Sequence, residues 1–157
     1  MNLYKLIIII TLCFNDVFAF EELPIGFTAE EWGNRHLINE MGNRTDPPPT
    51  PIRNISEFER MQGVVIRYPF GISTSIIREM AEDVIIYCLV SSSQQNSAYN
   101  SMNSASVDMN NVEFIIGSTD SYWTRDYGPW WVVDGNNDVS VVDHTYNRPR
   151  PNDNQAP

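Results

Sequence analysis

The chain has 157 residues, of which 42% are hydrophobic and 19% are charged, so it is long and apolar enough to form a globular domain and does not resemble a disordered segment. Its formal net charge is -10, from 20 acidic against 10 basic side chains. This charge argues against nucleic acid or an anionic membrane surface as a partner, because both require a basic face. An acidic field favours cationic substrates, although acidity equally serves to keep a protein in solution.

Residues 1–19 are predicted to be a signal peptide. Lys5 gives the segment a positive start, and the apolar run from Leu6 to Phe14 is too short to span a bilayer. Ala19 ends the small-residue pattern that signal peptidase recognises, so we expect cleavage before Phe20. The sequence therefore predicts a secreted or periplasmic protein with no stable membrane association after cleavage.

Residues 20–56 are predicted to form an N-terminal arm and a proline-rich linker. The stretch Pro47-Pro48-Pro49-Thr50-Pro51 forces an extended, polyproline-like path. Within the arm, Thr28 and Glu31 stand at the spacing of a capping box, which predicts a short helix.

From residue 63 onwards, apolar runs alternate with helical patterns and predict an α/β fold. Two strands, 63–68 and 84–90, enclose a helix that begins after Ser73 and buries Ile76, Ile77, Met80 and Ala81. The run 84–90 is apolar throughout, as expected for a strand covered on both faces. Further along the chain, the sequence predicts a weak helix and loop over 91–109, a third strand over 112–116, and a hairpin. The hairpin strands are 130–133 and 139–145, turned at 134–137. The connections between the first three strands favour parallel or mixed pairing.

The cysteines and histidines predict neither a disulfide nor a metal site, and no motif indicates a cofactor. Signal cleavage would remove Cys13 and leave Cys88, which lies in an apolar strand. We expect Cys88 to be a small buried hydrophobe and not a nucleophile, because burial raises a thiol pKa. His36 and His144 have no evident partner in the sequence and are expected to be structural or exposed.

Asp126 is expected in a loop after the third strand. Gly128 and Pro129 predict a tight turn that would hold its carboxylate rigidly. A carboxylate accepts two parallel hydrogen bonds from a guanidinium, each worth about 1.5–3 kcal/mol. Trp123 could form an aromatic wall beside such a cation, worth about 0.5–2 kcal/mol. Plainer interpretations are that Asp126 caps the turn or pairs with Arg125, and that Trp123 belongs to the core.

Arg148 and Arg150 each precede a proline, which favours extended backbone. Residues two apart on an extended chain point to the same side, so the two guanidinium groups would converge. The two guanidinium groups would repel each other unless an anion lay between them. A carboxylate suits this place, because the paired N–H donors of an arginine match its two oxygens. The alternative is a solvated basic edge on a proline-rich loop. Combined with Asp126, the pair predicts a site for a molecule with a guanidinium at one end and a carboxylate at the other, such as a peptide ending in arginine.

Three segments of the chain resemble the bacterial peptidylarginine deiminase and agmatine deiminase family of the pentein superfamily. They are Thr119-Asp120-Ser121-Tyr122-Trp123-Thr124-Arg125-Asp126-Tyr127-Gly128-Pro129, Tyr146-Asn147-Arg148-Pro149-Arg150-Pro151 and Glu59-Arg60-Met61-Gln62-Gly63-Val64-Val65-Ile66-Arg67-Tyr68-Pro69. The resemblance covers roughly residues 57–157. It implies a pentein fold, an α/β propeller of βαβ-containing units, of which residues 57–157 would form an incomplete N-terminal part.

The resemblance also implies a chemistry. Members of the family hydrolyse guanidinium groups to ureido groups without a metal: a cysteine thiolate attacks the guanidinium carbon, ammonia leaves, and water hydrolyses the thiouronium intermediate. By resemblance, Asp126 is a catalytic residue that holds the guanidinium and Trp123 lines the pocket. Arg148 and Arg150 resemble the pair that binds the C-terminal carboxylate of a peptide substrate.

The family's catalytic histidine, with an aspartate two residues later, and its late nucleophilic cysteine have no counterpart at His36, His144 or Cys88. We therefore expect an N-terminal fragment that is inactive alone, whose complete enzyme converts C-terminal peptidyl arginine to citrulline and ammonia. Agmatine deiminase, forming N-carbamoylputrescine, is the alternative; two arginines would repel the amine of agmatine. A third hypothesis is a non-catalytic module that binds arginine-ended peptides.

Overall fold

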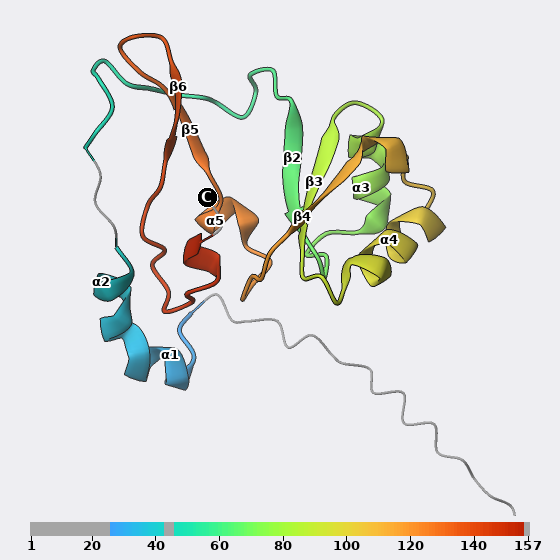
Figure 1. The fold of residues 1–157 in the computed structure, drawn as a ribbon, viewed down its shortest axis with the longest axis horizontal. Helices are drawn as coiled ribbons and strands as arrows, with labels where there is room; N and C mark the ends of the chain where they lie inside the picture. Colours follow the sequence, from blue (N-terminus) through green and yellow to red (C-terminus); the bar gives the residue numbers. More distant parts are fainter. Residues whose placement is uncertain (1–25, 43–45, 156–157) are drawn as a thin grey trace, which may run out of the picture.

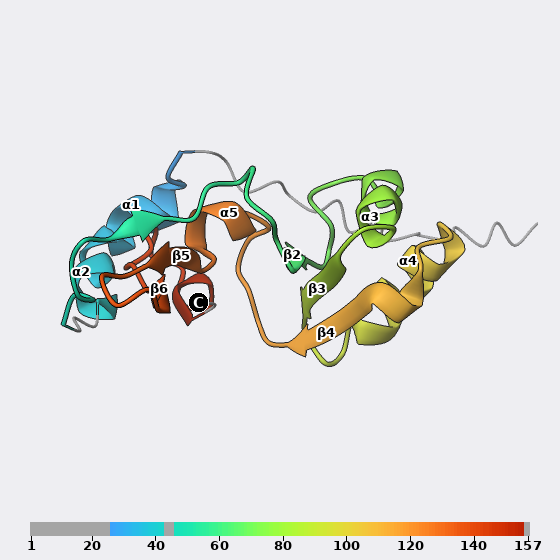
Figure 2. The ribbon, with the colours of Figure 1, turned by 90° about the horizontal axis from the view of Figure 1, so that it is seen from above.

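The computed structural model describes residues 26–42 and 46–155, and it contains two small β-sheets that lie side by side (Figures 1 and 2). One sheet is parallel, in the order β2-β3-β4, and the other is antiparallel, in the order β1-β5-β6. The predicted signal peptide lies outside the described residues and stays a prediction. In the part that the structure describes, no helix is long and apolar enough to cross a membrane.

The parallel sheet is built from β2 (Gly63–Arg67), β3 (Ile85–Val90) and β4 (Val112–Ile116). Helix α3 (Thr74–Ala81) connects the first two strands, and α4 (Gln95–Ser104) with the short turn η2 (Met109–Asn111) connects the last two. Ser73 caps α3 by accepting a hydrogen bond from the backbone N of Ile76 at 3.4 Å. The predicted strand–helix–strand–helix–strand order is confirmed, and of the parallel or mixed pairing that the connections favoured, the structure shows parallel pairing in this sheet.

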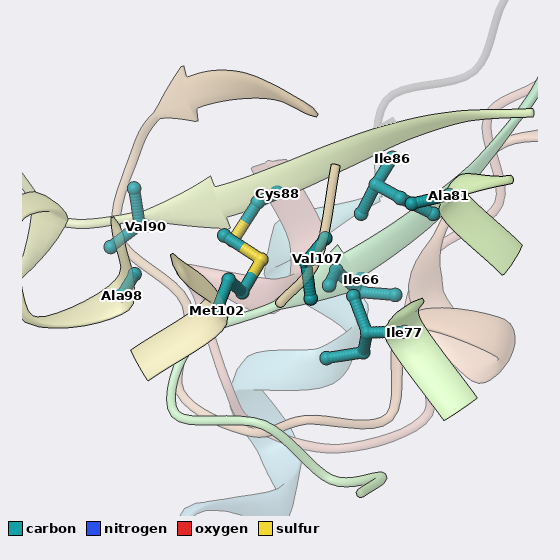
Figure 3. Packing of buried hydrophobic residues seen from close by; sticks show 9 residues of the cluster. All are labelled: Ile66, Ile77, Ala81, Ile86, Cys88, Val90, Ala98, Met102 and Val107. Carbon is teal, nitrogen blue, oxygen red and sulfur yellow. The ribbon is translucent and has the colours of Figure 1, made fainter. Parts of the chain in front are cut away.

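The hydrophobic core lies between this sheet and its two helices (Figure 3). Alternate residues of β3 face the helices, because side chains of a strand alternate between its faces. The fully buried members of the cluster include Ile77, Ala81, Ile86, Cys88, Ala98 and Met102.

Two details of the predicted packing are wrong. Helices α3 and α4 cover the same face of the sheet (Figures 1 and 2), whereas the run 84–90 predicted cover on both faces. On the opposite face, Leu89 is buried but Ile85 and Tyr87 are only half-buried, so this face is covered in part. Ile76 is 51% exposed, although its neighbour Ile77 is fully buried. Of two adjacent apolar positions on a short helix, only one lies at the centre of the buried face.

The antiparallel sheet contains the predicted hairpin. Strand β5 (Trp130–Val133) pairs with β6 (Val139–Val142), which ends three residues earlier than predicted. The two-residue strand β1 (Arg53–Asn54) pairs with the other edge of β5 and brings the end of the proline-rich linker into the sheet. Arg67 of β2 donates from Nε to Thr119 Oγ1 at 2.7 Å and ties the parallel sheet to the segment that leaves β4.

The arm folds into α1 (Ala29–Asn34), a 3-10 turn η1 (Arg35–Leu37) and α2 (Ile38–Met41), which lie near the antiparallel sheet (Figure 1). The predicted capping box is confirmed. The backbone N of Glu31 donates to Thr28 Oγ1 at 3.1 Å, and the backbone N of Thr28 donates to Glu31 Oε2 at 2.8 Å. Two further short elements, α5 (Thr124–Tyr127) and η3 (Asp153–Gln155), flank the hairpin in sequence.

Candidate functional site

A cavity of about 460 Å³ lies where α5, the start of β5 and the segment after β6 meet. All four side chains that the sequence analysis placed in a site line this one cavity. They are Trp123, Asp126, Arg148 and Arg150, and the lining also includes Trp130, His144, Thr145, Tyr146 and Asn147. The tertiary structure therefore brings an acidic side chain and two basic side chains to a shared cleft.

Asp126 lies in the one-turn helix α5 and not in the predicted loop. The helix ends at Gly128, where a Cβ would collide with the carbonyl oxygen of Thr124, so the turn requires glycine there. Arg125 forms an ion pair with Glu57, which replaces the alternative pairing of Arg125 with Asp126. The Asp126 side chain is exposed and faces the cavity as one of its lining groups.

His144 is a site residue that the sequence analysis missed. It is half-buried, it lines the cavity, and its Nε2 lies 2.9 Å from the backbone oxygen of Asp126. Because a carbonyl only accepts, Nε2 must carry the proton, and in the neutral ring Nδ1 is then an acceptor. That Nδ1 is buried and has no hydrogen-bond partner among the described groups. This contact gives His144 a structural role, one of the two that were expected, although the sequence indicated no partner for it.

Aromatic side chains form the walls of the cavity. Trp123 is half-buried and stacks at a tilt on Tyr122, with ring centroids 4.7 Å apart. Trp130 is 53% exposed, and its ring centroid lies 5.1 Å from that of His144. Neither indole belongs to the buried hydrophobic cluster, and both line the cavity, where an aromatic ring attracts a cation.

The arginine pair converges for a different reason from the one predicted. The backbone N of Arg150 donates to the backbone oxygen of Arg148 at 2.8 Å, which makes a tight bend instead of an extended path. Arg148 lies with its guanidinium carbon 4.3 Å from the ring centroid of Phe27. Arg150 is buried, and its Nε donates to Glu31 Oε1 at 2.6 Å. The arm therefore holds both arginines, which no local pattern in the sequence indicated.

A buried polar network holds the segment that carries Trp123. Asp153 is fully buried and accepts hydrogen bonds from the backbone N of Asp120 at 2.7 Å and from the backbone N and Oγ of Ser121 at 3.1 and 2.7 Å. Burial raises the pKa of Asp153 above its usual range, and these hydrogen bonds only partly offset that rise. Asp120 in turn accepts from the backbone N of Asn152 at 3.0 Å and from its Nδ2 at 2.7 Å. The network joins the two ends of the site-bearing stretch.

Cys88 is unsuited to nucleophilic attack, as predicted. It is fully buried in β3, and burial raises the pKa of its thiol to about 12. Within residues 26–42 and 46–155, no group of three or more His, Cys, Asp or Glu side chains could hold a metal ion.

No protein-family model matches the chain. Among solved structures, it is similar to a crystal structure described as that of "a putative peptidyl-arginine deiminase", with a TM-score of 0.52 and 19% identity, over 66% of this chain and 35% of the other. It is also similar to an agmatine deiminase from C. jejuni, with a TM-score of 0.47 and 16% identity, over 58% of this chain and 30% of the other.

The first likeness shows a shared fold, so the predicted α/β fold class is confirmed, and it agrees with the sequence resemblance. The chain spans about a third of the length of that structure, 35%.

Proposed function

We propose that this chain forms the substrate-binding part of an enzyme that hydrolyses guanidinium groups, and that its substrate is an arginine at the C-terminus of a peptide. The observation that carries the proposal is the shared cavity, about 460 Å³ in volume, which Asp126, Arg148 and Arg150 line together with two tryptophans. An arginine with a free carboxylate presents a cation and an anion to the opposite charges of this cleft.

At the cation end, the Asp126 carboxylate accepts two N–H groups of the substrate guanidinium. Such charge-assisted hydrogen bonds are worth about 1.5–3 kcal/mol each when solvent is excluded, and less while the carboxylate remains exposed. The rings of Trp123 and Trp130 give the planar cation an aromatic surface, which adds about 0.5–2 kcal/mol. His144 holds the backbone of Asp126 through its Nε2 contact of 2.9 Å, so the carboxylate extends from a backbone of fixed position.

At the anion end, the arginine pair separates the two candidate substrates. A C-terminal carboxylate gains hydrogen bonds from guanidinium groups, whereas the protonated amine of agmatine would face two positive charges. Arg150 is buried, where charges interact more strongly than in water. Peptidyl arginine is therefore the substrate that the charges of this cavity favour.

In the proposed reaction, water replaces one guanidinium nitrogen, so arginine becomes citrulline and the nitrogen leaves as ammonium. Covalent catalysis of this kind needs a thiolate. Cys88 is the one cysteine that the structure describes, and its thiol pKa of about 12 keeps it protonated. We propose that residues outside the described part supply the nucleophile and the general acid and base.

Calorimetric titration of the purified protein with three ligands tests the proposal. They are a peptide ending in arginine, the same peptide with a C-terminal amide, and agmatine. We expect the free carboxylate peptide to bind most tightly and agmatine most weakly. Mass spectrometry of the incubated peptide would then show whether citrulline forms. Equal affinity for the carboxylate and amide peptides would refute a role for the arginine pair, and tighter binding of agmatine would favour the alternative substrate.

A further inference from the structure

Glu31 connects the first helix to the last loop of the described chain through a buried ion pair. Arg150 Nε donates to Glu31 Oε1 at 2.6 Å, and only 5% of the Arg150 side chain and 11% of the Glu31 side chain are exposed. The spacing of Glu31 from Thr28 indicated a helix cap and nothing more. The structure shows that the same carboxylate also contacts a residue that lines the cavity.

The second oxygen of Glu31 is already engaged. Its Oε2 accepts from the backbone N of Thr28 at 2.8 Å, which is half of the capping box of α1. The carboxylate cannot turn to offer both oxygens to Arg150 without breaking that cap. Among the described groups, Arg150 Nη2 is buried and has no hydrogen-bond partner. Glu31 therefore holds the Arg150 guanidinium at Nε, and the Nη2 donor of the same guanidinium is left without a hydrogen bond.

The carboxylate of Glu31 stays charged beside Arg150. Burial raises the pKa of Glu31, but the hydrogen bonds from Arg150 and from the Thr28 N–H, with the charges of Arg150 and Arg148, outweigh it and hold the pKa below its usual value. Glu31 therefore carries a negative charge at neutral pH, next to the guanidinium of Arg150.

Resting on the proposed function, we propose that Glu31 is a positioning residue, which holds the Arg150 guanidinium at Nε so that its Nη2 is left to bind the substrate carboxylate. Glu31 acts through Arg150 and does not touch the substrate. The opposing hypothesis is that Glu31 occupies the place of the substrate carboxylate and must withdraw before binding. The two hypotheses predict opposite effects when the charge of Glu31 is removed.

The test compares the carboxylate peptide with its amide form on variants of the full chain. Glu31→Gln removes the charge with little change in shape, and we expect it to reduce the preference for the carboxylate peptide by about fivefold or more, while the affinity for the amide peptide changes less than about twofold. Glu30→Gln, at the exposed neighbouring position of α1, is the matched control and should behave as wild type. In an Arg150→Gln background, Glu31→Gln should have no further effect on the preference, because the contact it modifies is gone.

Each outcome decides the proposal. An unchanged preference in Glu31→Gln overturns it, and tighter binding of the carboxylate peptide supports the opposing hypothesis instead. A wild-type protein that does not prefer the carboxylate peptide refutes the proposed function, and this failure is distinct because it involves no variant. Thermal unfolding reports whether each variant folds. If Glu31→Gln does not fold, Glu31→Asp is tested instead, because it keeps the charge but withdraws the carboxylate by one methylene. A wild-type preference for the carboxylate peptide in Glu31→Asp would then overturn the positioning role.

Discussion

Replacing Asp126 with asparagine should weaken the binding of an arginine-ended peptide and leave the fold intact. The side chain is exposed, and its backbone oxygen, which accepts from His144, is unchanged by the substitution. Asparagine has nearly the same shape, but it replaces one carboxylate oxygen with a donor and removes the charge. Both changes act on the guanidinium of the ligand, so the effect should appear in the affinity.

The magnitude follows from the position of the carboxylate. Two charge-assisted hydrogen bonds in a dry site would total about 3–6 kcal/mol. Asp126 is exposed in a cavity that remains open to water, which screens the interaction, so we expect about 1.5–3 kcal/mol. This corresponds to a rise in Kd of roughly 10- to 150-fold.

The assay is calorimetric titration with the arginine-ended peptide and, in parallel, with the same peptide ending in citrulline. Citrulline is neutral, so wild type and Asp126→Asn should bind that peptide with similar affinity. Asp138→Asn, at an exposed position of the hairpin turn away from the cavity, is the matched control. The reasoning is refuted if Asp126→Asn binds the arginine peptide as tightly as Asp138→Asn does.

Two further predictions concern the core. Ile77→Ala should lower the free energy of unfolding by about 2–5 kcal/mol, because Ile77 is fully buried, whereas Ile76→Ala on the same helix should change it by no more than about 0.5 kcal/mol, because Ile76 is 51% exposed. Urea unfolding measures both, and equal losses would contradict the assigned face of α3. Folding raises the pKa of the Cys88 thiol from 9.0 to about 12, so the unfolded chain loses this proton at a lower pH than the folded chain. The stability that comes from keeping the buried thiol protonated is complete below pH 9 and is lost as the pH rises towards 12. Between pH 9 and 11, the free energy of unfolding should fall less steeply with pH in Cys88→Ala than in wild type, by up to about 1.4 kcal/mol per pH unit. Identical slopes in denaturation experiments would contradict the burial of an ionisable thiol at this position.

The sequence by itself determined the elements whose signals are local. The runs of β-branched and apolar residues over 84–90 and 112–116 specified two strands, because such side chains suit a pleated surface; the first strand begins one residue later than predicted. The capping pattern of Thr28 and Glu31 specified the start of α1, because its hydrogen bonds join residues three apart. The charges and aromatic rings after β4, together with the family resemblance, singled out Trp123, Asp126, Arg148 and Arg150 as candidates, and all four line one cavity.

Only the tertiary structure decided what surrounds those candidates. The contact of Glu31 with Arg150 joins residues 119 positions apart, and the contacts of Asp153 with Ser121 span 32 positions, so no periodicity or turn rule reports them. The approach of His144 to Asp126 likewise joins residues 18 positions apart. Local patterns describe the backbone of each segment, but the charge and orientation of a buried side chain are set by partners that folding brings from distant parts of the chain.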